Sequence, residues 1–456
     1  MTTAAQVLQG LFSAAGLEDP YRYYAELRRH GPVSLIGGSG PYPAVVTGYD
    51  AVNQVLRDPR VRVTDDAFSD THGGTAWRAH PLLAALNNSM MYSNGERHGA
   101  ARGLFQQVFT PRRVQELEPA MVAQISLLID GLEARLAADG EADFMAEFAY
   151  LLPSSVVAAL LGIPAEDLAW FRPRVQRINE FLDVTGKTAE VLRRADEATV
   201  ELSDYYRRLI AVRRAAPADD LISRLVAEGS SEVSDEELVC NLLVLFNASF
   251  VTTIHLLGNG LSLLLEHPEL RSYPVEPFVE EVLRYESPVQ FVARYADDVV
   301  EVAGTTIPPK EVVLVMLGAA NRDPETFSDA DRFEPARFMP DPEIHTAERR
   351  AGGVGRRGDA AGDSAVAGGV ARGAAGDAGR GRAATPPTPT GARPLSFGAG
   401  PHFCLGAALA RTEAQLAFPL LMERLPGLRA ARAAVRYPQQ FLRGYESMPV
   451  EVCDAP

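Results

Sequence analysis

Apolar residues recur three and four positions apart over long stretches of the chain, whereas the alternation typical of strands is brief. The helical spacing and composition predict helices over Asp19–Arg29, Pro111–Ala138, Glu190–Arg214, Asp235–His267, Val275–Arg284 and Cys404–Arg424. The predicted strands are Pro32–Leu35, paired with Ala44–Thr47, and Val299–Val302 and Val312–Val315, which flank a turn around Gly304 and Pro308. The pattern therefore predicts a mainly α protein with a small β region.

The segment from Val239 to Leu265 contains no Asp, Glu, Lys or Arg and is long enough to cross a bilayer. Polar residues are nevertheless spread along it: Asn241, Asn247, Ser249, Thr252, Thr253, His255 and Asn259. A helix that is apolar on most sides yet carries many polar groups is typical of the buried centre of a large protein. We therefore predict a core helix here and no membrane span.

Composition narrows the functional class. The 456 residues are 46% hydrophobic and 23% charged, as in a soluble globular protein, and the net charge is −15. An acidic protein is unsuited to nucleic acid, because phosphate binding needs a basic surface. Three cysteines cannot form a disulfide framework, and residues 1–30 lack the continuous apolar core of a signal or anchor. These features predict a cytoplasmic protein.

The strongest chemical signal is the run from Phe397 to Gly406, in which Cys404 lies among glycines directly before a helix-forming segment. A helix N-terminus stabilises a thiolate, and glycines let backbone N–H groups approach the sulfur. No second Cys or His stands at the spacing of a zinc clip. Ligation of haem iron by a single thiolate fits this pattern better than zinc binding does.

The run Phe397-Gly-Ala-Gly-Pro-His-Phe-Cys-Leu-Gly406 resembles the haem-thiolate signature of the cytochrome P450 family, with every defining position filled. The resemblance implies the cytochrome P450 fold, with one large domain over residues 1–456 around a single haem b. It also implies that Cys404 is the axial iron ligand. The lack of a membrane anchor resembles the soluble bacterial branch of the family.

Family members hold the two haem propionates with basic residues, because guanidinium groups pair well with carboxylates. His98 and Arg102 are four residues apart and resemble the family's His-x-x-x-Arg site. Arg294 matches a further propionate arginine, and His402 matches the basic position inside the signature. The resemblance thus implies four cofactor-binding residues besides Cys404.

A second set of charged residues resembles a structural network of the family. Glu281 and Arg284 are three residues apart, hence on one face of a helix. Arg337 follows in Phe333-Glu-Pro-Ala-Arg-Phe338, which resembles the family's segment downstream of the Glu-x-x-Arg helix. By this resemblance, the three residues form a buried charge network behind the haem and are structural rather than catalytic.

The run from Ala248 to Thr253 resembles the oxygen-activating motif of the family, in which a Thr hydroxyl orients water and an acid relays protons. Thr252 and Ser249 are the expected catalytic residues, and the Thr252 hydroxyl can bond back to the Ala248 carbonyl. Ser249 replaces the usual Gly and Val251 the usual acid. Three alternatives follow: protons arrive through Ser249, Thr252 and water; the reaction is slow or substrate-assisted; or the chemistry depends less on the second proton. His255, on the same helix, is expected to be a satisfied core histidine.

The resemblance implies a monooxygenase that inserts one oxygen atom from O2 into a C–H or C=C bond. Electrons would come from a ferredoxin and its NAD(P)H-dependent reductase, because no flavin domain is attached. Alternatives are oxidative coupling, desaturation or ring formation on the same fold, and a non-catalytic haem-binding sensor. The run from Phe441 to Val450 resembles enzymes that tailor polyketides, which favours secondary metabolism and a small-molecule substrate, free or carrier-bound.

The expected distal pocket is lined by Thr64–Tyr92, Phe246, Phe250 and Val289–Val292, which suits a bulky, mainly apolar ligand. Residues 349–393 depart from the family pattern. They contain eight Arg against three Asp and no aromatic residue, which predicts a disordered low-complexity insertion. It is either a neutral loop expansion or a basic flap that attracts an acidic ferredoxin.

Overall fold

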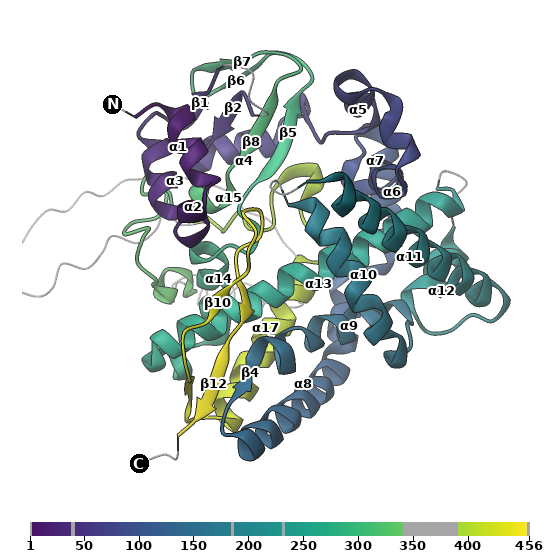
Figure 1. Cartoon of the computed structure of the whole chain (residues 1–456), viewed down its shortest axis with the longest axis vertical. Coiled ribbons are helices and arrows are strands. Elements are labelled where there is room, and N and C mark those ends of the chain that lie inside the picture. The colour runs from purple at the N-terminus through teal and green to yellow at the C-terminus, as the bar shows by residue number, and fades with distance from the viewer. Residues whose placement is uncertain (1, 38–41, 184–186, 230–232, 341–390, 454–456) are drawn as a thin grey trace, which may run out of the picture.

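The computed structural model describes residues 2–37, 42–183, 187–229, 233–340 and 391–453. Helices make up most of this part of the chain, and the small sheets lie beside them (Figure 1). The predicted mainly α architecture with a small β region is confirmed. All but the last three residues of the 349–393 insertion lie outside the described residues, so its predicted disorder and its docking role stay predictions.

The α-helices are α1 (Ala4–Leu11), α2 (Ala14–Glu18), α3 (Tyr21–Arg28), α4 (Tyr49–Arg57), α5 (Asp66–Gly73), α6 (Pro81–Asn87), α7 (Gly95–Val108), α8 (Pro111–Asp139), α9 (Leu151–Leu161), α10 (Leu168–Leu182), α11 (Ala189–Ala215), α12 (Leu221–Glu228), α13 (Asp235–Glu266), α14 (Val275–Tyr285), α15 (Leu317–Ala320) and α17 (Ala407–Arg424). Shorter 3₁₀ turns are η1 (Thr75–Ala79), η2 (Met90–Tyr92), η4 (Ala165–Asp167), η5 (Pro268–Ser272), η6 (Pro335–Phe338) and η7 (Gly400–His402), and η3 (Met145–Ala149) is a π-helical turn.

The six predicted helices are present, with ends set by local capping. Ser234 and Glu237 form a capping box at the start of α13, which satisfies two backbone N–H groups at that end. Thr110 caps α8, and Gly140 ends it with a φ of 77°, a conformation that glycine adopts without strain. Two helices begin later than predicted: α3 at Tyr21 instead of Asp19, and α17 at Ala407 instead of Cys404.

The strands are β1 (Val33–Leu35), β2 (Ala44–Val46), β3 (Val61–Arg62), β4 (Ala142–Asp143), β5 (Val292–Ala296), β6 (Val300–Val302), β7 (Thr305–Ile307), β8 (Val312–Val315), β9 (Leu428–Ala430), β10 (Val435–Arg436), β11 (Tyr445–Ser447) and β12 (Pro449–Val452). The largest sheet has the order β1-β2-β8-β5-β3, in which only the β2–β8 pair is parallel. The predicted pairing of β1 with β2 is confirmed, in the register Val33 to Val46.

The strands predicted around Gly304 exist but do not pair with each other. β6 pairs with β7 across Ala303 and Gly304, both at positive φ. Two such residues form the tight turn that matches the twist of a hairpin. β8 is thereby left to pair with β2 and β5, which brings β5 and its Arg294 into the large sheet.

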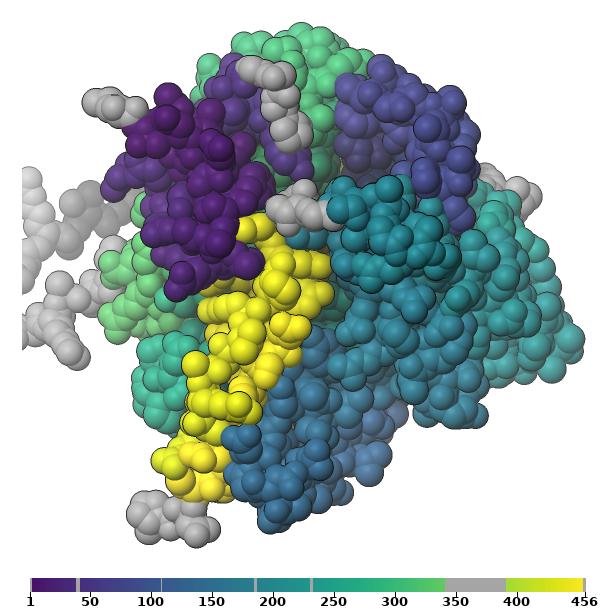
Figure 2. Space-filling model, viewed as in Figure 1, coloured from purple at the N-terminus to yellow at the C-terminus, as the bar shows by residue number. Residues whose placement is uncertain are grey.

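The main apolar core surrounds α13, which packs against α9, α11, α14 and α17. α13 is the one helix of the described residues that is long and apolar enough to cross a membrane, yet 83% of its most apolar stretch is buried inside the protein. The prediction of a core helix is thus confirmed. Figure 2 shows the C-terminal segment running between the N-terminal helices and the region of α8 and β4, and Leu442, Tyr445 and Val450 of this segment belong to the main core.

Candidate functional site

The Cys404 loop is shaped by glycines and by contacts with α4. Gly398 and Gly400 have φ values of 70° and 69°, which disfavour any side chain. A Cβ on Gly400 would lie 2.3 Å from the Leu56 carbonyl oxygen, so the close approach of the loop to α4 requires glycine here. The Cys404 amide donates to the Phe397 carbonyl at 2.9 Å, which closes the loop directly before α17.

The Cys404 thiol is free and accessible, although protein surrounds it closely. This desolvation raises the pKa of the thiol, against the lowering effects of the Gly406 N–H, Arg102 and Arg411. Accessibility together with desolvation indicates that the thiol borders a space within the protein. Among the described residues, no group of three His, Cys, Asp or Glu side chains could hold a metal ion, so a metal at Cys404 would need a ligand set supplied from elsewhere.

Four basic side chains converge beside this thiol, and we call them the cationic cradle: His98 and Arg102 on α7, Arg294 on β5 and His402 on η7. The rings of His98 and His402 lie 4.1 Å apart. Arg102 donates to the carbonyl of Phe403 at 2.8 Å, and Arg294 donates to the carbonyl of Ala293 at 2.8 Å. The structure thus brings together the four residues that the sequence predicted.

The cationic cradle lacks counter-charges. No carboxylate among the described residues forms an ion pair with any of its four side chains. Burial lowers the pKa of Arg294 to about 10. Burial, with the charges of His98, Arg294 and Arg102, lowers the pKa of His402 to about 3. The guanidinium groups of Arg102 and Arg294 therefore keep positive charge without a carboxylate partner, which is costly, and the cradle fits a ligand that carries carboxylates.

On α13, the accessible positions are confined to one patch. From Leu238 to Leu261, every residue of this fully described helix is buried except Ala248, Ser249 and Thr252. The Thr252 hydroxyl donates to the Ala248 carbonyl at 2.9 Å, as predicted. The Ser249 hydroxyl has no hydrogen bond to another described residue. The hydroxyl-bearing Ser249 and Thr252 are therefore the polar residues in the accessible patch of this stretch of α13.

Val251 and His255 frame this patch. Val251 is 7% exposed and belongs to the main apolar core, so no carboxyl group replaces the missing acid at this point of the helix. His255 is 1% exposed, as expected of a core histidine. The expectation that it is also satisfied was wrong: neither ring nitrogen has a hydrogen-bond partner among the described residues.

The predicted charge network is formed and buried, and we call it the compensated network. Arg284 donates to both oxygens of Glu281 at 2.7 and 2.8 Å, and both side chains are fully buried. Arg337 donates to Glu281 at 3.2 Å. The remaining donors of Arg284 reach backbone carbonyls, including that of Asn321. The protein itself therefore satisfies these charges.

Sequence reasoning missed two residues that connect this network to the loop. The Asn321 side chain accepts from the Leu395 amide at 2.7 Å and donates to Ser396 at 2.8 Å, and it thus holds the segment that enters the Cys404 loop. Arg411 forms an ion pair with Glu280 and lies over the Phe397 ring at 4.4 Å. Arg411 lies in the helix-forming run directly after Cys404. This proximity to the Cys404 motif was the one sequence signal that could have indicated its role.

The expected distal pocket residues lie in several places. Phe246 and Phe250 are buried on α13, and Phe246 packs against Phe171 of α10 with ring centroids 4.8 Å apart. Val292 begins β5 two residues before Arg294. Trp77 in the expected N-terminal wall is instead anchored to Asp70 at 2.8 Å and covered by Arg78.

Known proteins are similar to this chain in sequence. A family model described as Cytochrome P450 matches residues 6–272 and 275–358. Cytochrome P450 monooxygenase PikC of Streptomyces venezuelae is 34% identical over 448 residues, covering 95% of this chain and 91% of PikC. Polyketide biosynthesis cytochrome P450 PksS of Bacillus subtilis is 31% identical, covering 95% of this chain and 93% of PksS.

Solved structures agree with these relatives. The structure of P450BioI, in complex with an acyl carrier protein ligated to hexadec-9Z-enoic acid, matches with a TM-score of 0.77 and 29% identity. That match covers 96% of this chain and 100% of P450BioI.

Proposed function

Because the chain belongs to the cytochrome P450 family of oxidoreductases, we propose that it is a haem b monooxygenase that inserts one oxygen atom from O2 into a C–H or C=C bond of an organic substrate. The single observation that carries the proposal is the free Cys404 thiol beside the cationic cradle. One thiolate ligand and uncompensated cations fit the iron and the two propionates of a haem. We further propose that residues 1–456 fold as one domain around it.

Each part of the site has a distinct task in this proposal. Cys404 ligates the iron, and the haem so ligated supplies the oxidising chemistry. His98, Arg102, Arg294 and His402 bind and orient the propionates through charge-assisted hydrogen bonds.

Thr252 and Ser249 present hydroxyl groups that order water and pass protons at the oxygen-binding face. Thr252 is held in place by its bond to the Ala248 carbonyl. The buried surface of α13 around these two residues excludes bulk water.

We propose that the substrate is a polyketide-like secondary metabolite and that electrons come from a ferredoxin and its NAD(P)H-dependent reductase in the cytoplasm. PksS, a relative by sequence, carries polyketide biosynthesis in its name. The P450BioI complex includes an acyl carrier protein, which supports a carrier-bound substrate as one form. Hexadec-9Z-enoic acid, offered free and as its carrier-protein thioester, separates these forms by the haem spin-state shift each produces.

The first test is the absorbance difference spectrum of the dithionite-reduced protein with carbon monoxide. A band near ~450 nm is expected from intact thiolate ligation. A Cys404→Ser variant serves as the control and should lose this band while the cationic cradle stays intact. No haem signal in the wild-type protein would refute the proposal.

Oxidative coupling, desaturation or ring formation is a second candidate, and one observation favours it. Val251 is packed into the apolar core at the position where the resembled family motif has an acid, so delivery of the second proton lacks a carboxyl group on this turn. Mass analysis of products separates the two reactions, because insertion adds one oxygen atom and desaturation removes two hydrogens. A haem-binding sensor would give no product with a surrogate ferredoxin system.

A further inference from the structure

His255 is a buried polar group that the site described above does not use. Its side chain is 1% exposed, and neither ring nitrogen has a hydrogen-bond partner among the described residues. Burial lowers the pKa of the imidazole to about 3, so the ring is neutral and carries one N–H donor and one acceptor. Leaving both a donor and an acceptor unsatisfied in the interior destabilises the fold, which calls for a functional reason.

The position of His255 on α13 relates it to Thr252. Thr252, His255, Asn259 and Ser262 are spaced by three, four and three residues, which places them on one face of the helix. Helical side chains lean toward the N-terminus, so the surface that His255 covers lies over the turn of Thr252. Asn259 donates to the carbonyls of Glu286 and Arg443, both at 3.0 Å. A polar stripe therefore leads away from the Thr252 hydroxyl along an apolar helix.

The C-terminal turn closes the other side of the ring. A Cβ on Gly444 would lie 2.2 Å from His255 Nδ1, so only glycine leaves room for the imidazole here. The Tyr437 ring lies 4.7 Å from the His255 ring, centroid to centroid. His255 is thus enclosed between its own helix and the chain from Tyr437 to Gly444.

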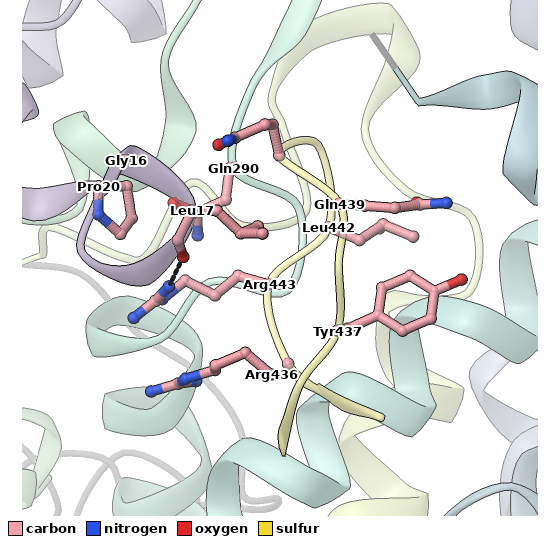
Figure 3. Close-up of a pocket in the computed structure, with 11 residues that line it drawn as sticks. Gly16, Leu17, Pro20, Gln290, Arg436, Tyr437, Gln439, Leu442 and Arg443 are labelled. Carbon is pink, nitrogen blue, oxygen red and sulfur yellow. Dashed lines mark hydrogen bonds between the residues drawn. The ribbon is translucent and has the colours of Figure 1, made fainter. Parts of the chain in front are cut away.

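Gly444 and Tyr437 also line a small cavity. Its volume is about 10 Å³, which is room for about one water molecule. Figure 3 shows the cavity between the segment of Leu17 and Pro20 and the C-terminal turn, where Arg443 donates to the Leu17 carbonyl. Arg436 and Arg443 supply polar wall groups. The same two residues that touch His255 therefore form part of the wall of a polar, water-sized space.

α13 offers no acidic group for the same task. Between Glu237 and Glu266 the helix carries no Asp or Glu, and Val251 is buried in the apolar core. His255 is the titratable side chain on the Thr252 face within this stretch. A neutral imidazole can pass a proton without holding charge, because one nitrogen accepts while the other donates.

We propose that His255 relays protons from water in the Gly444–Tyr437 cavity to the hydroxyl of Thr252. The water gives a proton to one ring nitrogen, and the other nitrogen releases its own proton toward Thr252. The ring then carries its proton on the opposite nitrogen, and water-mediated exchange of that proton between the two nitrogens restores the starting tautomer. One proton moves per cycle, no electron moves, and only N–H and O–H bonds are exchanged. The relay rests on the proposed monooxygenase function, and His255 acts through Thr252 as a positioning residue.

The test compares His255→Phe with His255→Gln and with Ser262→Ala, a matched change on the same helix face beyond the relay. Styrene is the probe substrate. Each haem-loaded variant oxidises it with NAD(P)H and a surrogate ferredoxin system, and separately with iodosylbenzene, which donates a single oxygen atom and needs no O–O cleavage. The measurements are epoxide formed and hydrogen peroxide released per NAD(P)H.

We expect epoxide per NAD(P)H to fall about tenfold or more in His255→Phe and His255→Gln, with a matching rise in peroxide. The iodosylbenzene reaction should stay within about twofold of wild type, and Ser262→Ala should match wild type in both. Unchanged coupling in His255→Phe would overturn the relay. An equal loss with both oxidants would assign His255 a packing role instead.

Two further readouts do not depend on turnover of the variants. A high-resolution crystal structure should show an ordered water within hydrogen-bond distance of a His255 ring nitrogen, and its absence would overturn the relay. The carbon monoxide spectrum of the wild-type protein separates the two proposals. Without a ~450 nm band the monooxygenase function fails, whereas a normal band with unchanged coupling in His255→Phe removes the relay alone.

Discussion

The compensated network and the cationic cradle are two groups of enclosed basic side chains that differ in who supplies their counter-charges. Arg284 and Arg337 share the carboxylate of Glu281, and the other donors of Arg284 reach backbone carbonyls. Within the described residues, the arginines of the cationic cradle donate to the Phe403 and Ala293 carbonyls and to no carboxylate. The first cluster is complete as folded, and the second needs a ligand.

The source of the counter-charges distinguishes a structural role from a ligand-binding role, independently of any sequence motif. Removing one member of a satisfied buried pair leaves its partner unpaired, which destabilises the fold. Removing one member of an unpaired cluster relieves repulsion in the ligand-free protein and weakens only the bound state. Substitutions in the two clusters should therefore act on different observables.

At a fixed neutral pH, the largest loss of stability from a change within the two clusters is expected for Arg284→Leu. The change leaves the buried Glu281 carboxylate without its main partner, and we expect a loss of about 3–5 kcal/mol in the free energy of unfolding. Urea unfolding followed by far-ultraviolet circular dichroism measures it. Exposed Arg29, paired with Glu26, provides the control, since Arg29→Leu should cost about 1 kcal/mol or less. Equal losses in the two variants would contradict the assignment.

Arg294→Leu should weaken haem binding and leave the stability of the ligand-free protein unchanged or higher. Loss of one charge-assisted bond to a propionate costs about 1.5–3 kcal/mol of binding, or about 10–100-fold in haem retention. Transfer of haem to an excess of apomyoglobin measures the retention, and Arg294→Lys should fall between wild type and Leu. The ligand-free protein should unfold at the same urea concentration as wild type or higher. A large loss of stability with unchanged haem retention would place Arg294 with the compensated network.

Much of the helical framework could be predicted because its signals are local. The ends of α8 follow from Thr110, Pro111 and Gly140, and the start of α13 follows from its capping box. The pairing of β8 could not be predicted in the same way, since it depends on β2, which lies far away in the sequence. Local signals fixed the elements, and long-range contacts decided their neighbours.

In the candidate site, too, some residues could be predicted from sequence motifs, whereas others depend on long-range contacts. The residues of the cationic cradle and the compensated network were named from a family resemblance, and the structure brings each set together. Asn321 carries no sequence signal, because its role comes from bonds to segments before and after it. The unsatisfied state of His255 also depends on Gly444, almost two hundred residues later, which no helix pattern reveals.

A pH-dependent effect is expected at Glu413 of α17, a buried carboxyl group that, unlike Glu281, has no basic partner in the described part of the chain. It is 2% exposed, and burial raises its pKa to about 8. The folded protein therefore keeps a proton here up to about pH 8, whereas the unfolded chain releases it above its ordinary value. Between these values stability falls as pH rises, by up to about 1.4 kcal/mol per pH unit.

Glu413→Gln keeps the shape of the group and removes its titration. We expect the variant to lose this slope and to be more stable than wild type at pH 8, with little difference near pH 4. Urea midpoints at several pH values measure the effect. If stability depended on pH in the same way in both proteins, Glu413 would have a partner in solution. Its charge would then be satisfied, like that of Glu281 in the compensated network.

The smallest effect concerns the connection between the compensated network and the Cys404 loop. Ser396 donates to the Leu283 carbonyl at 2.5 Å and receives a bond from Asn321 at 2.8 Å. Ser396→Ala should cost about 1 kcal/mol in the free energy of unfolding, with haem retention unchanged, because the cationic cradle is untouched. Asn321→Ala also frees the Leu395 amide next to the loop. It should therefore reduce stability further and weaken the ~450 nm band. If Ser396→Ala alone weakened that band, the fold and the ligand site would be coupled through this serine, and the separation of the two clusters would fail at this point.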